Sequence, residues 1–184
     1  MEQKAYIIGE ETVRKYLTAE DVIDITEKTW RWYGEGKVVM PNKITTDMSG
    51  LGIAGWFNSM PAYIGPMDTA GIKVVGGYDG NKALGLPYIK ANVLLTDPRT
   101  GILKALVSGD YINDMRTGAQ PAVMVKLLAA KTDIITIIGT GLMAYYSLLC
   151  MSKTVDIKEV RLCDISEEAK DRFIARSRML PGSL

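Results

Sequence analysis

The chain has 184 residues, of which 47% are hydrophobic and 23% charged, a composition typical of globular proteins with a packed core rather than of disordered or fibrous ones. Lys and Arg total 22 and Asp and Glu total 21, so the charge balance argues against a nucleic-acid or membrane-surface partner and favours a small molecule. Histidine is absent, which excludes Ser-His and Cys-His dyads, histidine general bases and most catalytic zinc sites.

The first predicted elements are two helices. Residues 10–17 favour a short helix, and Thr18 with Asp21 forms a capping-box signal for a longer one. Apolar residues follow a helical period in the longer helix, and Gly34 with Gly36 ends it. We expect its apolar face to lie in the core or at a subunit contact.

A mostly antiparallel sheet is predicted next, because residues 44–107 consist of short β-rich runs separated by turn residues. The predicted strands are 44–48, 52–58, 70–76, 87–96 and 102–107, and Pro98 with Gly101 favours a hairpin turn between the last two. A helical pattern then runs from Asp110 to about residue 131, and Pro121 within it predicts a kink or a second helix start.

The C-terminal part shows the pattern of a dinucleotide-binding fold. Residues 134–138 are a continuous aliphatic run, typical of a parallel strand buried on both faces. Gly139-Thr140-Gly141 and Ala144 follow it directly and open a predicted helix, and Asp164 ends the next predicted strand 23 residues after Gly141. Strand, glycine turn, helix and acidic residue in this order form the dinucleotide fingerprint.

Each residue of this fingerprint has a physical reason. Gly139 permits a tight turn, Gly141 has no Cβ to block the pyrophosphate, and Ala144 lets helix and strand pack closely. Asp164 would accept hydrogen bonds from the adenosine ribose and oppose a 2′-phosphate, and residues 165–168 hold no Lys or Arg to receive one, which favours NAD over NADP. The alternative is an ordinary turn with Asp164 as a helix cap.

Two cations upstream are candidates for substrate binding. Lys73 lies in an apolar predicted strand, so it either extends to solvent or meets an anion. Arg116 suits a carboxylate but equally suits a helix surface.

The ordered set of motifs resembles the ornithine cyclodeaminase and mu-crystallin family. The set comprises Gly71-Ile72-Lys73-Val74-Val75, Gly85-Leu86-Pro87, Asp97-Pro98-Arg99-Thr100-Gly101, Asp114-Met115-Arg116-Thr117-Gly118-Ala119 and the glycine turn. This resemblance implies an α/β protein, in which an N-terminal α+β substrate and dimerisation domain (residues 1–120) precedes an incomplete Rossmann-type domain (residues 121–184).

The resemblance also implies roles for individual residues. Lys73 would be catalytic and would contact the amino-acid carboxylate together with Arg116. Asn58 stands where cyclodeaminases carry a glutamate, and Lys43 where they carry an arginine, so both belong to the expected substrate site. The expected NAD site comprises Tyr88, Arg116, Thr117, Gly139, Thr140, Gly141, Leu142, Met143, Asp164, Ile165 and Ser166. Trp56 and Phe57 indicate either a different side-chain preference or core packing.

The implied reaction is the NAD-dependent conversion of ornithine to proline and ammonia through Cα hydride transfer and an imine. Alternatives within the family are alanine dehydrogenation, ketimine reduction and a non-catalytic, crystallin-like role; an unrelated Rossmann protein is a further alternative. Relatives continue well beyond residue 184 and supply a catalytic aspartate there, so we expect the chain to be truncated and to turn over little by itself. A homodimer is also implied.

Cellular location and metal binding have weaker signals. No apolar run approaches the ~18 residues of a membrane span, and the N-terminus lacks a signal-peptide pattern, so we expect a cytoplasmic protein. Cys150 and Cys163 are too few for a disulfide framework or a metal site, and we expect both to be reduced and buried.

Overall fold

A computed structural model of the chain describes residues 4–178 and residue 180 and shows an α/β fold. The described residues form two compact units. Unit 1 comprises the described residues up to Tyr16 together with Thr29–Asn113, and unit 2 comprises Leu17–Lys28 together with the described residues from Asp114 onward. The domain boundary between residues 120 and 121 stays a prediction.

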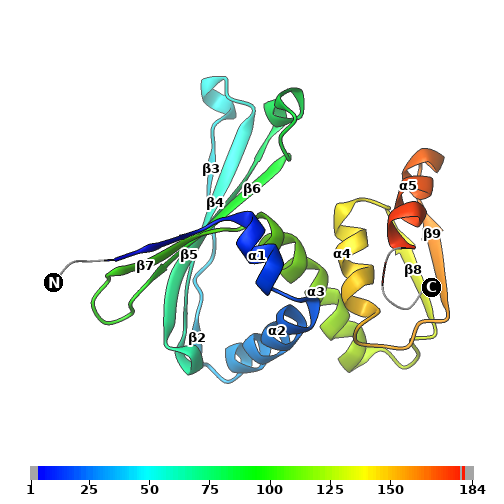
Figure 1. Ribbon diagram of the computed structural model, residues 1–184, viewed down its shortest axis with the longest axis horizontal. Coiled ribbons are helices and arrows are strands. Elements are labelled where there is room, and N and C mark those ends of the chain that lie inside the picture. Colours follow the sequence, from blue (N-terminus) through cyan, green and yellow to red (C-terminus); the bar gives the residue numbers. More distant parts are fainter. Residues whose placement is uncertain (1–3, 179, 181–184) are drawn as a thin grey trace. The chain divides into compact units, whose positions relative to one another are not determined.

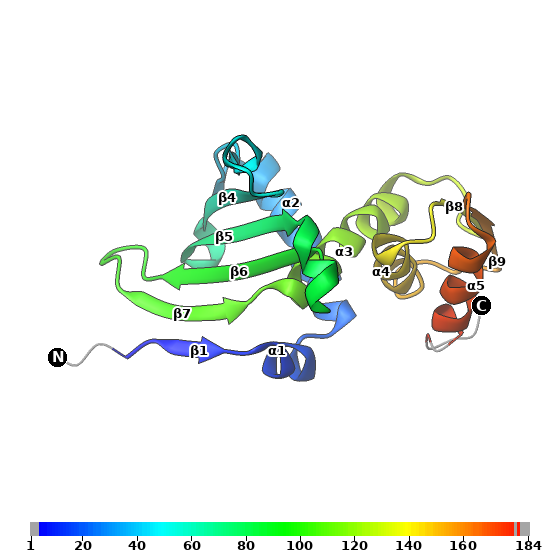
Figure 2. The same cartoon turned by 90° about the horizontal axis from the view of Figure 1, so that it is seen from above.

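Unit 1 is built on one seven-stranded sheet with the order β1-β7-β6-β5-β4-β2, in which β3 also pairs with β4 (Figure 1). Strands β3 to β7 form antiparallel pairs, whereas β1 lies parallel to β7 at the edge of the sheet (Figure 2). The strands are β1 (Tyr6–Ile8), β2 (Val38–Val39), β3 (Ile44–Asp47), β4 (Gly55–Ile64), β5 (Thr69–Tyr78), β6 (Ile89–Thr96) and β7 (Leu103–Ser108). Short 3-10 turns cover Ser49–Leu51, Gly65–Met67 and Asp79–Leu84.

The predicted central strands are confirmed, but β4 is longer than expected and contains Pro61. Proline lacks the N–H that a central strand donates. Pro61 is accommodated because it lies in a gap on one side of β4: β3 pairs with Trp56–Ser59 and β2 with Tyr63–Ile64. β4 therefore continues past a residue that usually ends a strand.

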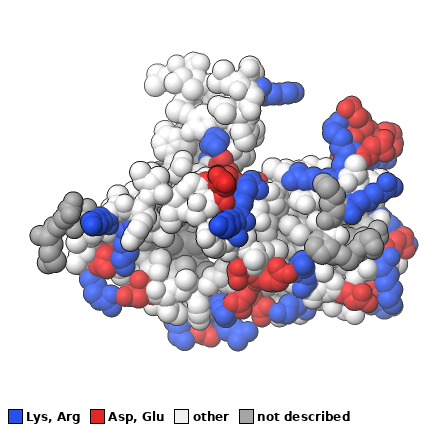
Figure 3. All heavy atoms as spheres, in the orientation of Figure 1, with Lys and Arg blue, Asp and Glu red and all other residues white. Residues whose placement is uncertain are grey.

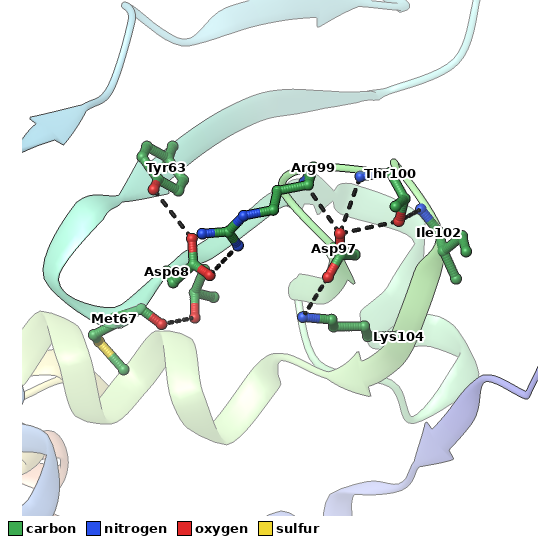
Figure 4. A network of polar contacts seen from close by, with 9 residues as sticks. Tyr63, Met67, Asp68, Asp97, Arg99, Thr100, Ile102 and Lys104 are labelled. Carbon is green, nitrogen blue, oxygen red and sulfur yellow. Dashed lines mark hydrogen bonds and ion pairs between the residues drawn. The ribbon is translucent and has the colours of Figure 1, made fainter.

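The predicted hairpin turn between β6 and β7 is present and is tied to the tip of the β4–β5 hairpin (Figure 4). Asp68 accepts hydrogen bonds from the Tyr63 hydroxyl and from Arg99. Asp97 accepts bonds from the backbone of Arg99 and Thr100 and pairs with Lys104. These contacts, led by the one with Lys104, hold the pKa of Asp97 well below its usual range.

The helices before the dinucleotide fold are α1 (Glu10–Tyr16), α2 (Ala19–Gly34) and α3 (Asp110–Leu128). The predicted capping box of α2 is confirmed, because the Thr18 and Asp21 side chains each accept a bond from the backbone N–H of the other residue. No second helix starts at Pro121, because α3 continues through it. Its neighbours Ala119, Ala122 and Val123 are completely buried, and this packing sustains the helix.

Unit 2 ends in a βαβα segment formed by β8 (Ile134–Ile138), α4 (Leu142–Met151), β9 (Glu159–Cys163) and α5 (Glu167–Ser177). The two strands are parallel, as predicted. Leu148 and Phe173 lie at the centre of a small core, which receives Ile137, Val160 and Leu162 from one face of the strands. α4 and α5 are the helices that supply this core.

The expectation that residues 134–138 are buried on both faces was wrong. Ile134, Thr136 and Ile138 are exposed, whereas the residues between them are partly buried. The reason is that the helices of the described βαβα segment cover one face of the strands only. Cys163 lies on the uncovered face and is exposed, so its expected burial was also wrong; Cys150 is buried as expected.

In the view of Figure 3, charged side chains of both signs lie over the lower part and the right-hand side of the surface, whereas the upper part is mostly uncharged. In the part of the chain that the structure describes, none of the helices has the combined length and hydropathy of a membrane span. The same residues contain no cluster of His, Cys, Asp or Glu that could hold a metal ion.

Candidate functional site

The glycine turn between β8 and α4 has the backbone that the fingerprint requires. Gly139 adopts a φ of 84°, a left-handed conformation that side chains other than glycine rarely adopt, and its N–H donates to the carbonyl of Cys163 over 2.7 Å. Gly141 has an ordinary φ of −80°, and a Cβ placed on it would meet nothing within 4 Å. The space beside Gly141 is therefore open to a ligand, next to the unpaired N–H groups of the first turn of α4.

Asp164 joins the glycine turn to the start of α5. Its Oδ2 accepts bonds of 2.7 Å from both the backbone N–H and the hydroxyl of Thr140, and its Oδ1 accepts a 3.0 Å bond from the N–H of Ser166. The bond from the Thr140 backbone is the main cause that lowers the pKa of Asp164 to about 2. At neutral pH the residue is a carboxylate that fixes the turn.

A pocket of about 430 Å³ lies in unit 2 between the first turns of α4 and the inner side of α5. Its lining includes four residues of the predicted NAD site, namely Thr140, Gly141, Leu142 and Asp164. Five further lining residues were not predicted: Tyr145, Ala169, Arg172, Phe173 and Arg176. The i, i+4 spacing of the two arginines in α5 is the signal that could have revealed them.

The other predicted cofactor residues lie outside the lining of this pocket. Ile165 is fully exposed. The hydroxyl of Ser166 accepts a bond from the N–H of Ala169 and so caps α5. Met143 and Thr117 are partly buried.

In unit 1, one face of the sheet carries Lys73 and Asn58. Lys73 is partly buried, and its Nζ donates a 3.0 Å bond to Oδ1 of Asn113 in α3. Asn58 lies opposite Val75 in the register and is only 6% exposed, and its Oδ1 accepts a 2.6 Å bond from the Thr45 hydroxyl. Residues in this diagonal relation lie roughly 7–8 Å apart at Cα. The two predicted substrate residues are therefore neighbours on one face.

Asn113 was missed by the sequence analysis. It is 7% exposed and is one of three buried polar or charged residues among those described. A single asparagine near the start of a helix carries no sequence signal, and only the structure reveals that Lys73 bonds to it. Asn113 and Arg116 are three residues apart in α3, a spacing that places them on one face of the helix.

Burial lowers the pKa of the Arg116 guanidinium, and the negative charge of Asp114 partly opposes this effect. A cation that is partly removed from water is stabilised by an anionic ligand. Lys43, in contrast, is exposed in the segment before β3.

Two aromatic residues meet on the same sheet face as Lys73. The Trp56 Nε1 lies 3.4 Å from the hydroxyl of Tyr88, which is 50% exposed. Gly77 makes this contact possible, because a Cβ there would lie 2.7 Å from the Tyr88 ring and 2.9 Å from Trp56 Nε1. Tyr88 and Trp56 thus form an aromatic surface above a glycine of β5.

Several known proteins resemble this chain in sequence. The family profile of the Ornithine cyclodeaminase/mu-crystallin family matches residues 3–181. Alanine dehydrogenase of Archaeoglobus fulgidus is 32% identical over 170 residues, which are 92% of this chain and 51% of that protein. The chain thus spans about half the length of this relative.

Solved structures of relatives also resemble this chain in fold. An archaeal alanine dehydrogenase dimer with bound NAD superimposes with a TM-score of 0.87 at 30% identity, over 95% of this chain and 53% of that one. Delta(1)-pyrroline-2-carboxylate reductase of Thermococcus litoralis, in complex with NADH and L-proline, superimposes with a TM-score of 0.85 at 30% identity, over 92% of this chain and 52% of that one. The chain belongs to the ornithine cyclodeaminase/mu-crystallin family.

Proposed function

We propose that the chain is the part of an NAD-dependent enzyme that binds an amino or imino acid and the first half of the cofactor. The observation that carries this proposal is the glycine turn, where Gly139 takes a positive φ, Gly141 leaves open space, and Asp164 borders the same pocket. The bound NAD and NADH named for two solved relatives support it.

NAD, when bound, would supply hydride transfer to or from the Cα of the substrate. Two parts of the chain would hold the cofactor. The open N–H groups at the start of α4 and the positive end of the helix would stabilise the pyrophosphate. Asp164 would accept a hydrogen bond from the adenosine ribose, exchanging one of its present bonds to Thr140 for that contact.

The substrate would bind through its carboxylate. Lys73 is our candidate catalytic residue: its ammonium can bind the carboxylate and stabilise negative charge during hydride transfer. Asn113 keeps this ammonium in place through its 3.0 Å bond. Arg116, one helical turn beyond Asn113, would supply a second cation with a planar fork that matches a carboxylate.

The reaction type depends on whether the enzyme oxidises an amino acid or reduces an imine. Amino-acid dehydrogenation and imine reduction are the reactions named for the two solved relatives, so we propose an oxidoreductase. The conversion of ornithine to proline remains the second candidate, because the family takes its name from that activity.

A substrate panel on the full-length protein tests this proposal. NAD would be offered with L-alanine, L-proline or L-ornithine, and NADH with pyruvate and ammonia or with a cyclic imino acid. We expect a net change in NADH with at least one oxidoreductase pair, whereas cyclodeamination would form proline without net NADH. Cofactor binding without turnover of any pair would favour a crystallin-like role.

The variant Lys73→Met should abolish the activity found in this panel. The matched control is Lys104→Met, because Lys104 is half exposed and pairs with Asp97 at the hairpin tip. If both variants keep full activity, the role assigned to Lys73 is wrong.

We also propose a homodimer that forms through the second face of the unit 1 sheet. That face carries Ile72, Val74, Leu94 and Leu106, and a shallow apolar groove of about 460 Å³ runs along it. Val74 and Leu106 are 37% and 40% exposed. The dimer named for the archaeal relative supports this proposal. Light scattering of wild type and Val74→Glu tests it: wild type should be dimeric and the variant monomeric.

A further inference from the structure

The face of the unit 1 sheet that carries Lys73 also holds a buried side-chain amide with a fixed orientation. Asn58 is 6% exposed, and the register places it directly opposite Thr45 of β3. Its Oδ1 accepts a 2.6 Å bond from the Thr45 hydroxyl. This length is typical of an O–H···O bond and short for an N–H···O bond, so the amide oxygen points towards Thr45. The Nδ2 group of Asn58 therefore points away from Thr45.

Asn58 and Lys73 present the same kind of group to a ligand. The Nδ2 of an asparagine and the ammonium of a lysine both donate hydrogen bonds and cannot accept them. The two residues are diagonal neighbours on one sheet face, roughly 7–8 Å apart at Cα. A ligand that lies between them therefore meets donors on both sides.

A cationic group is unfavourable in this position. A ligand ammonium near Asn58 would be repelled by the positive charge of Lys73 and would find no acceptor on Nδ2. The burial of Asn58 increases the cost, because a charge that leaves water without gaining an acceptor is destabilised. An oxygen acceptor would be stabilised by the same donors, and an apolar group would leave the charge of Lys73 unopposed but meet no repulsion.

The acidic residue on this face lies further away. Among the described strand residues of the face, Asp47 is the one carboxylate, and it lies opposite Trp56, one row beyond Asn58 as seen from Lys73. Asp47 is exposed, and its Oδ1 accepts a 2.9 Å bond from the N–H of Ser49. Solvent and salt screen an exposed charge, so Asp47 compensates a cation at Asn58 only weakly.

We propose that Asn58 determines the specificity of the substrate site: it admits side chains that are apolar or end in an oxygen acceptor and rejects side chains that end in an ammonium. A substrate whose carboxylate binds Lys73 has its side chain within reach of Asn58, because the two residues are neighbours. The inference rests on the proposed function, since it names the substrate class of that same site, and it disfavours ornithine.

Calorimetric titration of the full-length protein in the presence of NADH measures this selection. The probes are L-norvaline and L-ornithine, which differ only in the ammonium at the end of the ornithine side chain. We expect wild type to bind L-norvaline at least about tenfold more tightly. Asn58→Asp should shift the ratio of the two dissociation constants about 10- to 100-fold in favour of L-ornithine, because the new carboxylate accepts a charge-assisted hydrogen bond.

A second variant changes the orientation of the amide without adding a charge. Thr45→Val removes the hydroxyl that holds Oδ1, so the amide can turn its oxygen towards the ligand and the preference for L-norvaline should fall. Thr46→Val is the matched control, because Thr46 is equally exposed and lies opposite Phe57 on the other face of the sheet. It should change neither dissociation constant.

The inference is overturned if wild type binds L-ornithine as tightly as L-norvaline, or if L-norvaline does not bind while a compound of the substrate panel does. It is also overturned if Asn58→Asp and Thr45→Val both keep the wild-type ratio of dissociation constants. If the two probes and every compound of the substrate panel fail to bind, the proposed function itself is wrong.

Discussion

Replacing either glycine of the turn by alanine separates backbone strain from ligand binding. A Cβ on Gly139 or on Gly141 would meet nothing within 4 Å, so neither substitution crowds a neighbour. The two positions differ in φ, which is 84° at Gly139 and −80° at Gly141. The difference in stability between the two variants therefore isolates the cost of the left-handed conformation.

That cost is roughly 1–2 kcal/mol for a residue with a side chain. Both variants share the loss of unfolded-chain entropy that a glycine-to-alanine change brings, so it cancels in the comparison. We expect Gly139→Ala to unfold at a temperature about 2–8 °C below that of Gly141→Ala, since 1 kcal/mol corresponds to about 2–4 °C at this chain length.

Thermal unfolding followed by circular dichroism measures this difference, and NADH fluorescence measures binding in the same samples. Gly141→Ala should keep the stability of the wild type but bind NADH more weakly, because its methyl group enters the space left for the pyrophosphate. Equal unfolding temperatures for the two variants would refute the reasoning from φ.

Three further predictions follow from packing, ionisation and thiol burial. Gly118→Ala should lower the free energy of unfolding by about 1–3 kcal/mol, because a Cβ there would lie 2.4 Å from backbone atoms of Tyr146. The control Gly9→Ala should be close to neutral, because a Cβ on Gly9 would meet nothing within 4 Å. Similar unfolding temperatures for the two variants would contradict the close contact between Gly118 and the backbone of Tyr146. The pKa of Asp164 is lowered from 3.8 to about 2, so its ionised form stabilises the fold above pH 4 and this contribution is lost as pH falls towards 2. The stability advantage of wild type over Asp164→Asn should therefore shrink across that range in acid titrations, and a constant advantage would speak against the Thr140 contacts. Cys163 is exposed and should react with a thiol reagent in the folded protein. Burial raises the pKa of Cys150 to about 12 and should delay its reaction until the protein unfolds. Mass spectrometry of the labelled peptides measures the order of labelling, and labelling of Cys150 before Cys163 would contradict the burial assignments.

Local sequence signals predicted the helices and the long strands well. The capping box at Thr18 and the glycine turn each depend on residues close together in the chain. β1 and β2 were missed because segments of three and two residues show no periodicity, and they exist only through pairing with distant strands. The same limit explains why Pro61 could not be placed inside β4.

In the candidate site, too, some residues could be identified from local sequence motifs and others only from the structure. Lys73, Arg116 and the glycine turn were identified from motifs, whereas their roles rest on the family resemblance. Asn113 escaped detection because its significance arises from a bond from Lys73, which is distant in the sequence. Arg172 escaped detection because only the fold shows that it lines the same pocket as Asp164 and the glycine turn. The exposure of β8 was mispredicted because an aliphatic run does not reveal how many helices cover the strand.

The most direct test of the account uses the amino acid that proves active in the substrate panel, labelled with deuterium at its Cα. Mass spectrometry of the cofactor then shows whether the deuterium is transferred to NAD. The account predicts deuterated NADH from the full-length wild-type protein and none from Lys73→Met. Unlabelled NADH from the wild type, or equal transfer by both proteins, would contradict it.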